Sequence, residues 1–465
     1  MSTLPEWVIR KLVFPLWSWR DHPGYSGYLR AFLRTQFLSR AQIEALQFER
    51  LNKLLKHAYA QCPFYRRRLA AAGINGDTLT SLDAFKALPL LGKRDIQDNG
   101  PEMLARDFAE SDRVRNQTGG STGSPLQFYV DKRRFDSRLA STVRHNGWAG
   151  YQPGDWCAEL WGARLDEVTG RGWWDWCRNR FLYRLVPLNT SLIRPEDWDL
   201  FIAALRKRRP RFIVAYTQSA LLFARHLREK RVDDIRFESI ITTAEVLLPG
   251  QREFLQETFG GRVFNRYGCR EVSVIASECD QHRGLHVNAE ALLVEIVPDP
   301  FLPAPSGKVV ITDLLNFSMP LIRYEIGDVG QWSENQECPC GRALPLLADI
   351  QGRITDFLVL SHGLKVSGPS LTLVVSDMPD VRQVQFIQKS RDEVTLRVVP
   401  GYAYGPETAA ELRKRLSLYL KGLARLDIEL VESIPSLASG KYRFVVNESE
   451  SEKAGTADTL EGARV

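Results

Sequence analysis

Short apolar runs alternate with amphipathic helical stretches between about residue 110 and residue 350, and no other feature constrains the fold as strongly. The runs at 158–162, 212–216, 239–243 and 263–268 have the pattern of buried strands. Helical spacing marks the stretches between them, at 197–207, 219–231 and 249–259. This alternation predicts an α/β fold with a largely parallel, helix-covered sheet. Ligands of such sheets bind at the carboxyl ends of the strands.

The pattern changes on both sides of this region. Residues 1–75 read as a helical extension that includes a long amphipathic helix at 41–58, and we expect the main domain to occupy 76–353. Alternating runs at 291–297 and 307–313 predict antiparallel strands in a small β-barrel-like part. Residues 354–447 indicate a small, mobile α+β domain, with strands near 357–360, 383–389, 394–399 and 427–431 and a helix at 406–423. The polar stretch 448–465 has the composition of a disordered tail.

Composition is that of a globular protein: 44% of the 465 residues are hydrophobic and 25% are charged. A formal net charge of +6 helps to attract an anionic substrate but does not indicate nucleic-acid binding. No apolar run reaches the roughly 18 residues of a membrane span. The N-terminus lacks the cleavage pattern of a secretory signal, so we expect a cytoplasmic protein without a transmembrane segment. The aromatic and basic N-terminal segment suits a membrane surface or, as we favour, packing against the main body.

A loop at 118–125, with the sequence TGGSTGSP, can wrap a polyphosphate. Glycines allow the backbone N–H groups to converge on anionic oxygens, and the hydroxyl groups add donors. A polar hairpin loop is the alternative, and the Lys of a Walker-type loop is absent. The other motifs of the chain decide between these interpretations.

Five segments occur in a fixed order along almost the whole chain. They are TGGSTGSP at 118–125, YGCRE at 267–271, RYEIGD at 323–328, GRITD at 352–356 and SGK at 439–441. This set resembles the adenylate-forming (AMP-binding) superfamily, and within it the phenylacetate–coenzyme A ligase-like branch with its capsule-biosynthesis relatives. The resemblance implies an enzyme that joins a small carboxylic acid to AMP, using ATP and Mg²⁺, and then passes the acyl group to coenzyme A.

The resemblance also implies roles for the residues that would act on the phosphates. Glu271 would hold Mg²⁺, and Lys441 would swing in on the mobile C-terminal domain to neutralise charge on the α-phosphate and the carboxylate. The loop would hold the β- and γ-phosphates, with Thr122 taking part in catalysis. The loop residues carried over are Thr118, Gly119, Gly120, Ser121, Thr122 and Gly123.

Adenine recognition is implied at the ends of two predicted strands. Tyr267, followed by Gly268, would stack on adenine, while Ala244 and Glu245 would line the purine edge. Cys269 could act as a nucleophile in isolation, but we favour packing beneath the nucleotide.

Contacts with the ribose and phosphates are implied by the later motifs. Asp328 would accept hydrogen bonds from both ribose hydroxyls, and Arg353 would add a ribose or phosphate contact. Arg270 stands where the superfamily often has Thr, so a guanidinium replaces a hydroxyl beside the α-phosphate. Thr355 occupies a position where an acidic hinge residue is common, which makes Asp356 the favoured pivot.

Four of the seven cysteines lie in the central part of the chain near two histidines, and a subset of these residues suits a metal. Cys279, His286, Cys338 and Cys340 supply the four ligands of a tetrahedral structural Zn²⁺, with His282 as a substitute for His286. Zinc sites of this type occur in relatives that the chain resembles. The alternative is a group of reduced thiols near a loop.

Three functions remain open. The first is an acyl-coenzyme A ligase; the second keeps adenylation but transfers the acyl group to an amine, a carrier-protein thiol or a sugar. The third is a non-catalytic, zinc-stabilised nucleotide-binding protein. The tryptophan-rich region 156–190 suggests a pocket for a flat or apolar acid, and equally suits core packing or the interface of a homodimer.

Overall fold

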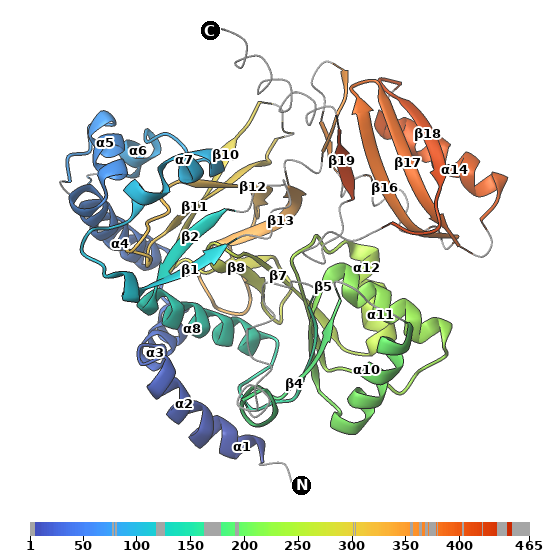
Figure 1. Ribbon diagram of the computed structural model, residues 1–465, viewed down its shortest axis with the longest axis horizontal. Coiled ribbons are helices and arrows are strands. Elements are labelled where there is room, and N and C mark those ends of the chain that lie inside the picture. The colour runs from blue at the N-terminus through green and yellow to red at the C-terminus, as the bar shows by residue number, and fades with distance from the viewer. Residues whose placement is uncertain are drawn as a thin grey trace, which may run out of the picture.

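The computed structural model shows an α/β protein, as the sequence predicts (Figure 1). It describes residues 5–76, 79, 81–117, 126–161, 178–190, 195–300, 302, 304–353, 357–361, 365–367, 371, 378, 380–401, 404–420, 422–434 and 444–448. The predicted tail lies outside these residues except for residue 448.

The parallel section of the main sheet consists of β3 (Cys157–Trp161), β4 (Leu185–Asn189), β5 (Phe212–Tyr216), β6 (Ser239–Thr243) and β7 (Arg262–Cys269). Every residue of β5 and β6 is buried, which explains why these strands read as continuous apolar runs. They are flanked by α10 (Pro195–Arg208), α11 (Thr217–Glu229) and α12 (Pro249–Phe259), whose aromatic residues Phe223 and Phe259 enter the core.

Six more strands extend the same sheet by antiparallel pairing. They are β8 (Ser273–Glu278), β9 (Leu285–Val287), β10 (Leu292–Pro298), β11 (Gly307–Asp313), β12 (Tyr324–Trp332) and β13 (Leu346–Arg353). The order across the described sheet is β10-β11-β12-β13-β9-β8-β7-β6-β5-β3-β4. The sheet is therefore mixed, because hairpins and short loops build its antiparallel half, and the expected barrel-like part is continuous with the parallel section.

This antiparallel section is curled. Strands β7 and β12 are four places apart in the strand order, which would separate them by about 19 Å in a flat sheet. Nevertheless the hydroxyl of Tyr267 on β7 donates a hydrogen bond to Asp328 on β12. The curl therefore brings two segments that are distant in sequence to one site.

Helices and a hairpin cover the antiparallel section. The helices are α4 (Arg40–Gln61), α5 (Pro63–Ala71), α6 (Leu82–Lys86), α7 (Lys93–Met103) and α8 (Lys132–Trp148), and η2 (Glu110–Asp112) is a short 3-10 turn. The hairpin pairs β1 (Arg113–Gln117) with β2 (Gln127–Asp131). Buried residues of α4, such as Leu51 and Leu54, share a core with sheet residues such as Val309 and Ile311.

The N-terminal segment forms α1 (Glu6–Val8), η1 (Ile9–Val13), α2 (Phe14–Asp21) and α3 (Tyr25–Thr35). Its inner face packs in a small core in which Ile9, Phe14 and Phe32 contact residues of α8 and of η4 (Asn179–Tyr183). None of the described helices has the length and apolarity required to cross a bilayer.

The C-terminal elements are β14 (Phe357–Val359), β15 (Lys365–Ser367), β16 (Val381–Ser390), β17 (Glu393–Pro400), α14 (Pro406–Leu420), β18 (Arg425–Leu430) and β19 (Val445–Asn447). Four of these strands form a sheet in the order β18-β17-β16-β19, which lies beside the main body in Figure 1. This region has its own core, with Phe386 and Leu396 packed against Leu412 and Leu416 of α14.

Candidate functional site

The site is built around the β7–β8 hairpin, which carries the YGCRE motif in its last strand residues and its turn. The register shifts between Tyr267 and Gly268, so the hairpin contains a bulge next to the turn. A Cβ atom at Gly268 would lie 2.6 Å from the carbonyl oxygen of Ser273. Because such an approach is forbidden, only glycine allows the two strands to come this close.

Asp328 reaches this hairpin from a distorted part of β12. Lys308 pairs with Val329 and Val310 pairs with Glu325, so three residues of β12 lie opposite the single residue Val309. Gly327, at the centre of this distortion, has a φ of 85°, a conformation that favours glycine. The hydroxyl of Tyr267 donates to Oδ2 of Asp328 at 2.7 Å. The adenine-stacking and ribose-binding residues implied by the resemblance are therefore direct neighbours.

Glu271 lies in the hairpin turn, and 9% of its surface is exposed. Its Oε1 accepts a hydrogen bond from the Tyr324 hydroxyl at 3.1 Å. Burial, with the charge of Glu271, raises the pKa of Tyr324, so the phenol remains protonated and remains a donor. A carboxylate has about four lone-pair positions on its two oxygens, so Glu271 retains the capacity to bind a hard cation.

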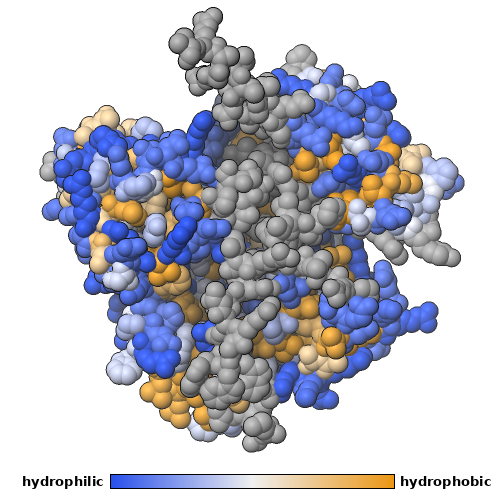
Figure 2. Space-filling model, in the orientation of Figure 1, coloured by the Kyte–Doolittle hydropathy of each residue, from blue (hydrophilic) through white to orange (hydrophobic). Residues whose placement is uncertain are grey.

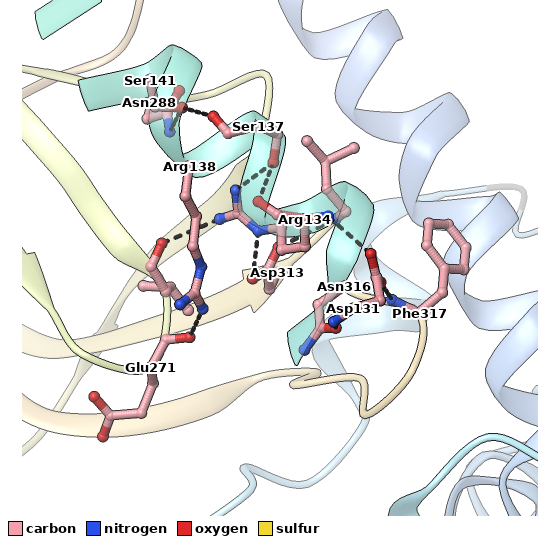
Figure 3. A network of polar contacts seen from close by, with 12 residues as sticks. Asp131, Arg134, Ser137, Arg138, Ser141, Glu271, Asn288, Asp313, Asn316 and Phe317 are labelled. Atoms are coloured by element: carbon pink, nitrogen blue, oxygen red, sulfur yellow. Dashed lines mark hydrogen bonds and ion pairs between the residues drawn. The ribbon is translucent and has the colours of Figure 1, made fainter. Parts of the chain in front are cut away.

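Two buried arginines of α8 donate hydrogen bonds to the backbone of this turn (Figure 3). Arg138 donates to the carbonyl oxygen of Arg270 at 3.5 Å and, more closely, to that of Glu271. Arg134 donates to the carbonyl oxygen of Val272 at 3.1 Å. Three consecutive carbonyls are thus fixed by one helix, while the Glu271 carboxylate points away from Arg138.

The position of α8 is itself fixed by buried polar contacts. Arg134 pairs with Asp313 of β11 at 2.8 Å, and both side chains are fully buried. Asp131 caps the helix by accepting from the Arg134 N–H at 2.7 Å. Removing one partner of such a buried pair typically costs about 3–5 kcal/mol. The α8 helix therefore connects the hairpin turn to strand β11.

The other predicted adenine contacts lie just beyond β6. Ala244 has a φ of 70°, and Glu245 follows it. The Glu245 carboxylate accepts from the N–H of Gln218 at 2.7 Å, and its carbonyl accepts from the Thr217 hydroxyl at 3.1 Å. Glu245 therefore caps the N-terminus of α11, and its role at a purine edge stays a prediction.

The predicted metal ligands lie together at the far end of β8 and β9. Their ligand atoms all lie within 4.8 Å of one another: Cys279, His286, Cys338 and Cys340. The sulfurs of Cys279 and Cys338 are 3.7 Å apart, and Sγ of Cys340 is 3.3 Å from Nε2 of His286. With Zn–S bonds of about 2.3 Å, a tetrahedral site separates two sulfurs by about 3.8 Å, so this donor set fits zinc.

His282 is not part of this cluster. Its Nδ1 lies 3.3 Å from Oε2 of Glu278, and its ring packs on Phe264 at 4.8 Å between centroids. Burial lowers the pKa of His286 to about 4, which keeps that imidazole in the neutral form that binds metals. The structure thus favours His286 over His282 as the fourth ligand.

Cys269 does not have the properties of a nucleophile. Burial, followed by the charge of Glu271, raises its pKa well above the ordinary value. Since the thiolate is the reactive form, this shift disfavours a nucleophilic role for the thiol. Packing beneath the site, the favoured interpretation, agrees with this environment.

The structure brings together only part of the residue set taken from the motifs. Tyr267 contacts Asp328, and Glu271 and Asp328 both lie close enough to Cys269 for their charges to raise its pKa. The backbone of Arg353 lies opposite that of Asp328 in the register of β12 and β13. The phosphate loop at 118–125 and Lys441 lie outside the described residues, as does the predicted hinge at 355–356.

Three functional residues are absent from the sequence-based set: Tyr324, Arg134 and Arg138. Tyr324 lies within the RYEIGD motif, and this position in the motif indicates a role at the site. The two arginines on α8 carry no signal of burial in the sequence, because arginine is mostly exposed and is almost never fully buried unless it is paired.

Comparison with known proteins shows similarity to phenylacetate–coenzyme A ligases and to CapK. Residues 358–448 match the family described as the CapK C-terminal domain. The chain is 28% identical to a phenylacetate–coenzyme A ligase of Thermus thermophilus over 354 residues, which cover 74% of this chain and 77% of that protein. It is 22% identical to the protein CapK of Staphylococcus aureus over 406 residues, covering 86% of this chain and 88% of CapK.

A solved structure shows the same fold. It is that of a 2-hydroxyisobutyryl-CoA ligase in the postadenylation state with a bound acyl-AMP, with a TM-score of 0.75 and 21% identity over 92% of this chain and 94% of that chain. The resemblance drawn from the five motifs is confirmed by these comparisons.

Proposed function

We propose that this chain, a relative of the phenylacetate–coenzyme A ligases and of CapK, activates a carboxylic acid with ATP and transfers the acyl group to coenzyme A. A carboxylate oxygen attacks the α-phosphorus of ATP, which gives an acyl adenylate and releases pyrophosphate. The coenzyme A thiol then attacks the acyl carbon, which gives a thioester and AMP. The observation that supports this proposal most directly is the contact of Tyr267 with Asp328 beside the hairpin turn that carries Glu271.

Tyr267 and Asp328 would bind the nucleoside. The phenol donates to one carboxylate oxygen of Asp328, so its ring and that carboxylate have fixed relative positions before any ligand arrives. The ring offers a face for adenine, and the carboxylate offers its remaining lone pairs to the ribose hydroxyls. Arg353, opposite Asp328, would add a ribose or phosphate contact. Such preorganisation lowers the entropic cost of binding.

Glu271 would hold Mg²⁺, which supplies positive charge to the phosphates during adenylation. The Tyr324 hydroxyl orients the Glu271 carboxylate, and the arginines of α8 fix its backbone. The loop from Thr118 to Pro125 would hold the β- and γ-phosphates, and Lys441 would neutralise charge on the α-phosphate.

A structural zinc ion would be held by Cys279, His286, Cys338 and Cys340. Four protein ligands leave no open position, so the ion would tie the β8–β9 turn to the β12–β13 loop without entering the reaction. A cytoplasmic location is part of this proposal, because the reaction would consume ATP and coenzyme A.

The test is carboxylate-dependent pyrophosphate release by the purified protein. We expect release of pyrophosphate with at least one acid of a broad panel, exchange of labelled pyrophosphate into ATP, and an acyl thioester when coenzyme A is added. Lys441→Ala should abolish adenylation. A protein that binds ATP tightly yet forms no adenylate with any acid would instead be a nucleotide-binding protein, and the proposal would fail.

A second candidate keeps adenylation but changes the acceptor. Two comparisons favour it: residues 358–448 match the CapK C-terminal domain, and the CapK relative is not named as a coenzyme A ligase. The acceptor would be an amine, a carrier-protein thiol or a sugar. A labelled acyl group that leaves the adenylate only when such an acceptor replaces coenzyme A would establish this alternative.

A further inference from the structure

The outer face of the N-terminal helical segment, residues 6–21, exposes large apolar side chains. The exposed fraction is 62% for Trp7, 53% for Leu12, 66% for Leu16 and 76% for Trp19. We call these four residues the outer apolar strip. Figure 2 shows apolar surface gathered over the region of α1 and α2. With a rise of 1.5 Å per residue, the strip is about 18 Å long.

The strip is not a by-product of loose packing. The opposite face of the same segment is buried, with Ile9 at 0% and Phe14 at 6% exposure. Trp17 packs edge-on against Tyr183 at 5.5 Å between ring centroids, and Arg10 pairs with Asp155 at 2.7 Å. The segment is therefore held firmly on the body of the protein and presents its second apolar face outwards. A monomeric surface rarely exposes a contiguous patch of this kind without a partner.

Basic side chains surround the strip. Residues 5–37 contain five Lys and Arg residues against two Asp and Glu residues, and one of those two, Asp21, is paired with Arg20 at 2.7 Å. Lys11 lies on the exposed side of the segment itself. Arg30 and Arg34 are exposed on the neighbouring α3. The partner of this surface must therefore accept both apolar side chains and positive charge.

We propose that this surface binds an anionic phospholipid bilayer, with the helical segment lying parallel to the membrane. Tryptophan and leucine would enter the boundary between headgroups and acyl chains, and the basic side chains would contact anionic headgroups. Tryptophan suits this boundary because its ring is apolar while its N–H can remain hydrated. Binding is peripheral, since none of the described helices is able to span the bilayer.

The positive charge of this surface argues against a second copy of the chain as its binding partner. A twofold-symmetric dimer places the same patch on both subunits. Both halves of such an interface would carry the positive charge of Lys11, Arg30 and Arg34 with little negative charge opposite, which is unfavourable. An anionic bilayer complements both features of the surface. This inference does not rest on the proposed enzymatic activity.

Vesicle co-sedimentation of the full-length protein tests the proposal. Vesicles of phosphatidylcholine with 30–40% phosphatidylglycerol (about one lipid in three) provide an anionic surface of the required kind, and pure phosphatidylcholine vesicles provide the neutral comparison. We expect binding to the anionic vesicles that weakens as salt is raised. The combined change Leu16→Glu and Trp19→Glu should lower the partition coefficient by about tenfold or more, since tenfold corresponds to only about 1.4 kcal/mol.

The control variant combines Leu200→Glu with Leu222→Glu. Both leucines are exposed, by 70% and 45%, on α10 and α11, so this variant adds the same negative charge at another apolar surface. It should bind anionic vesicles almost as well as the unchanged protein. Melting curves establish that both variants are folded. Equal binding to neutral and anionic vesicles, or equal loss in both variants, would overturn the proposal. So would a dimer in light scattering that the change at Leu16 and Trp19 converts to a monomer.

Discussion

Replacing Arg138 by methionine tests whether this arginine serves mainly to position the site or to stabilise the protein. The guanidinium donates to the carbonyl oxygens of Arg270 and Glu271, and its loss frees the turn that carries the proposed Mg²⁺ ligand. Methionine keeps most of the apolar stem of the side chain but loses the guanidinium, whose central carbon lies 5.8 Å from the centre of the Phe135 ring. We expect a large loss of adenylation and a small loss of stability.

Two opposing terms set the change in the free energy of unfolding. Burial, followed by repulsion from Arg134, lowers the pKa of Arg138 from 12.5 to about 10. At 1.36 kcal/mol for each pH unit, the cost of keeping this charge buried is on the order of 3 kcal/mol. Two hydrogen bonds from a charged donor contribute about 1.5–3 kcal/mol each. The hydrogen bonds exceed the cost of burial by about 0–3 kcal/mol, so the variant should lose roughly 1–2 kcal/mol and a few degrees of melting temperature.

The effect on the reaction should be larger, because a shift of about 1 Å in a catalytic group can reduce a rate a hundredfold. We expect pyrophosphate exchange to fall by about tenfold to a hundredfold, with a higher Mg²⁺ concentration at half-maximal rate. Arg138→Lys, which restores one charged donor, should recover part of the rate. Arg133→Met is the matched control, since Arg133 is exposed on the same helix. An Arg138→Met enzyme with an unchanged rate and unchanged Mg²⁺ dependence would refute the reasoning.

Three further outcomes follow from the same geometry. Tyr324→Phe removes the donor to Glu271 and should raise the Mg²⁺ concentration at half-maximal pyrophosphate exchange by about tenfold, with little change in melting temperature. Cys340→Ser, or treatment with a strong chelator, should lower the melting temperature and release about one zinc per chain, as measured by elemental analysis. Burial, followed by nearby arginines, keeps the pKa of His145 well below 6.5, so the unfolded chain binds the extra proton and stability should fall below pH 6.5. Urea unfolding between pH 7 and pH 5 measures how steeply the free energy of unfolding falls as pH is lowered. This decrease should be smaller in His145→Gln.

The parallel half of the sheet could be predicted because its signals are local. The bounds expected for β5, β6 and α12 agree with the structure. Strands buried on both faces must be apolar at every position, so their sequences stand out without reference to partners. The helix expected at 219–231 begins earlier, at Thr217, because Glu245 supplies its cap from a distant loop.

The antiparallel half depends on contacts that local patterns do not encode. β12 contains two glycines and three charged or amide side chains, and its register is irregular against both β11 and β13. β9 is three residues long and is defined by its pairing with β8 and β13. The curl that joins Tyr267 to Asp328 arises from these pairings. The motifs therefore predicted the members of the site, but not the means by which they meet.

The buried arginines show why the support of a site is harder to predict than the site itself. A residue that contacts ATP is constrained by the chemistry of ATP, so its type and spacing recur and can be read from a motif. At the turn, Arg134 and Arg138 contact only the backbone carbonyls of residues 270–272, and any buried donor of suitable length could serve there. Their burial is set by Asp313 and by the turn they hold, which are 132 or more residues away along the chain. Structure is needed to identify such residues, and activity measured against stability is needed to show what they do.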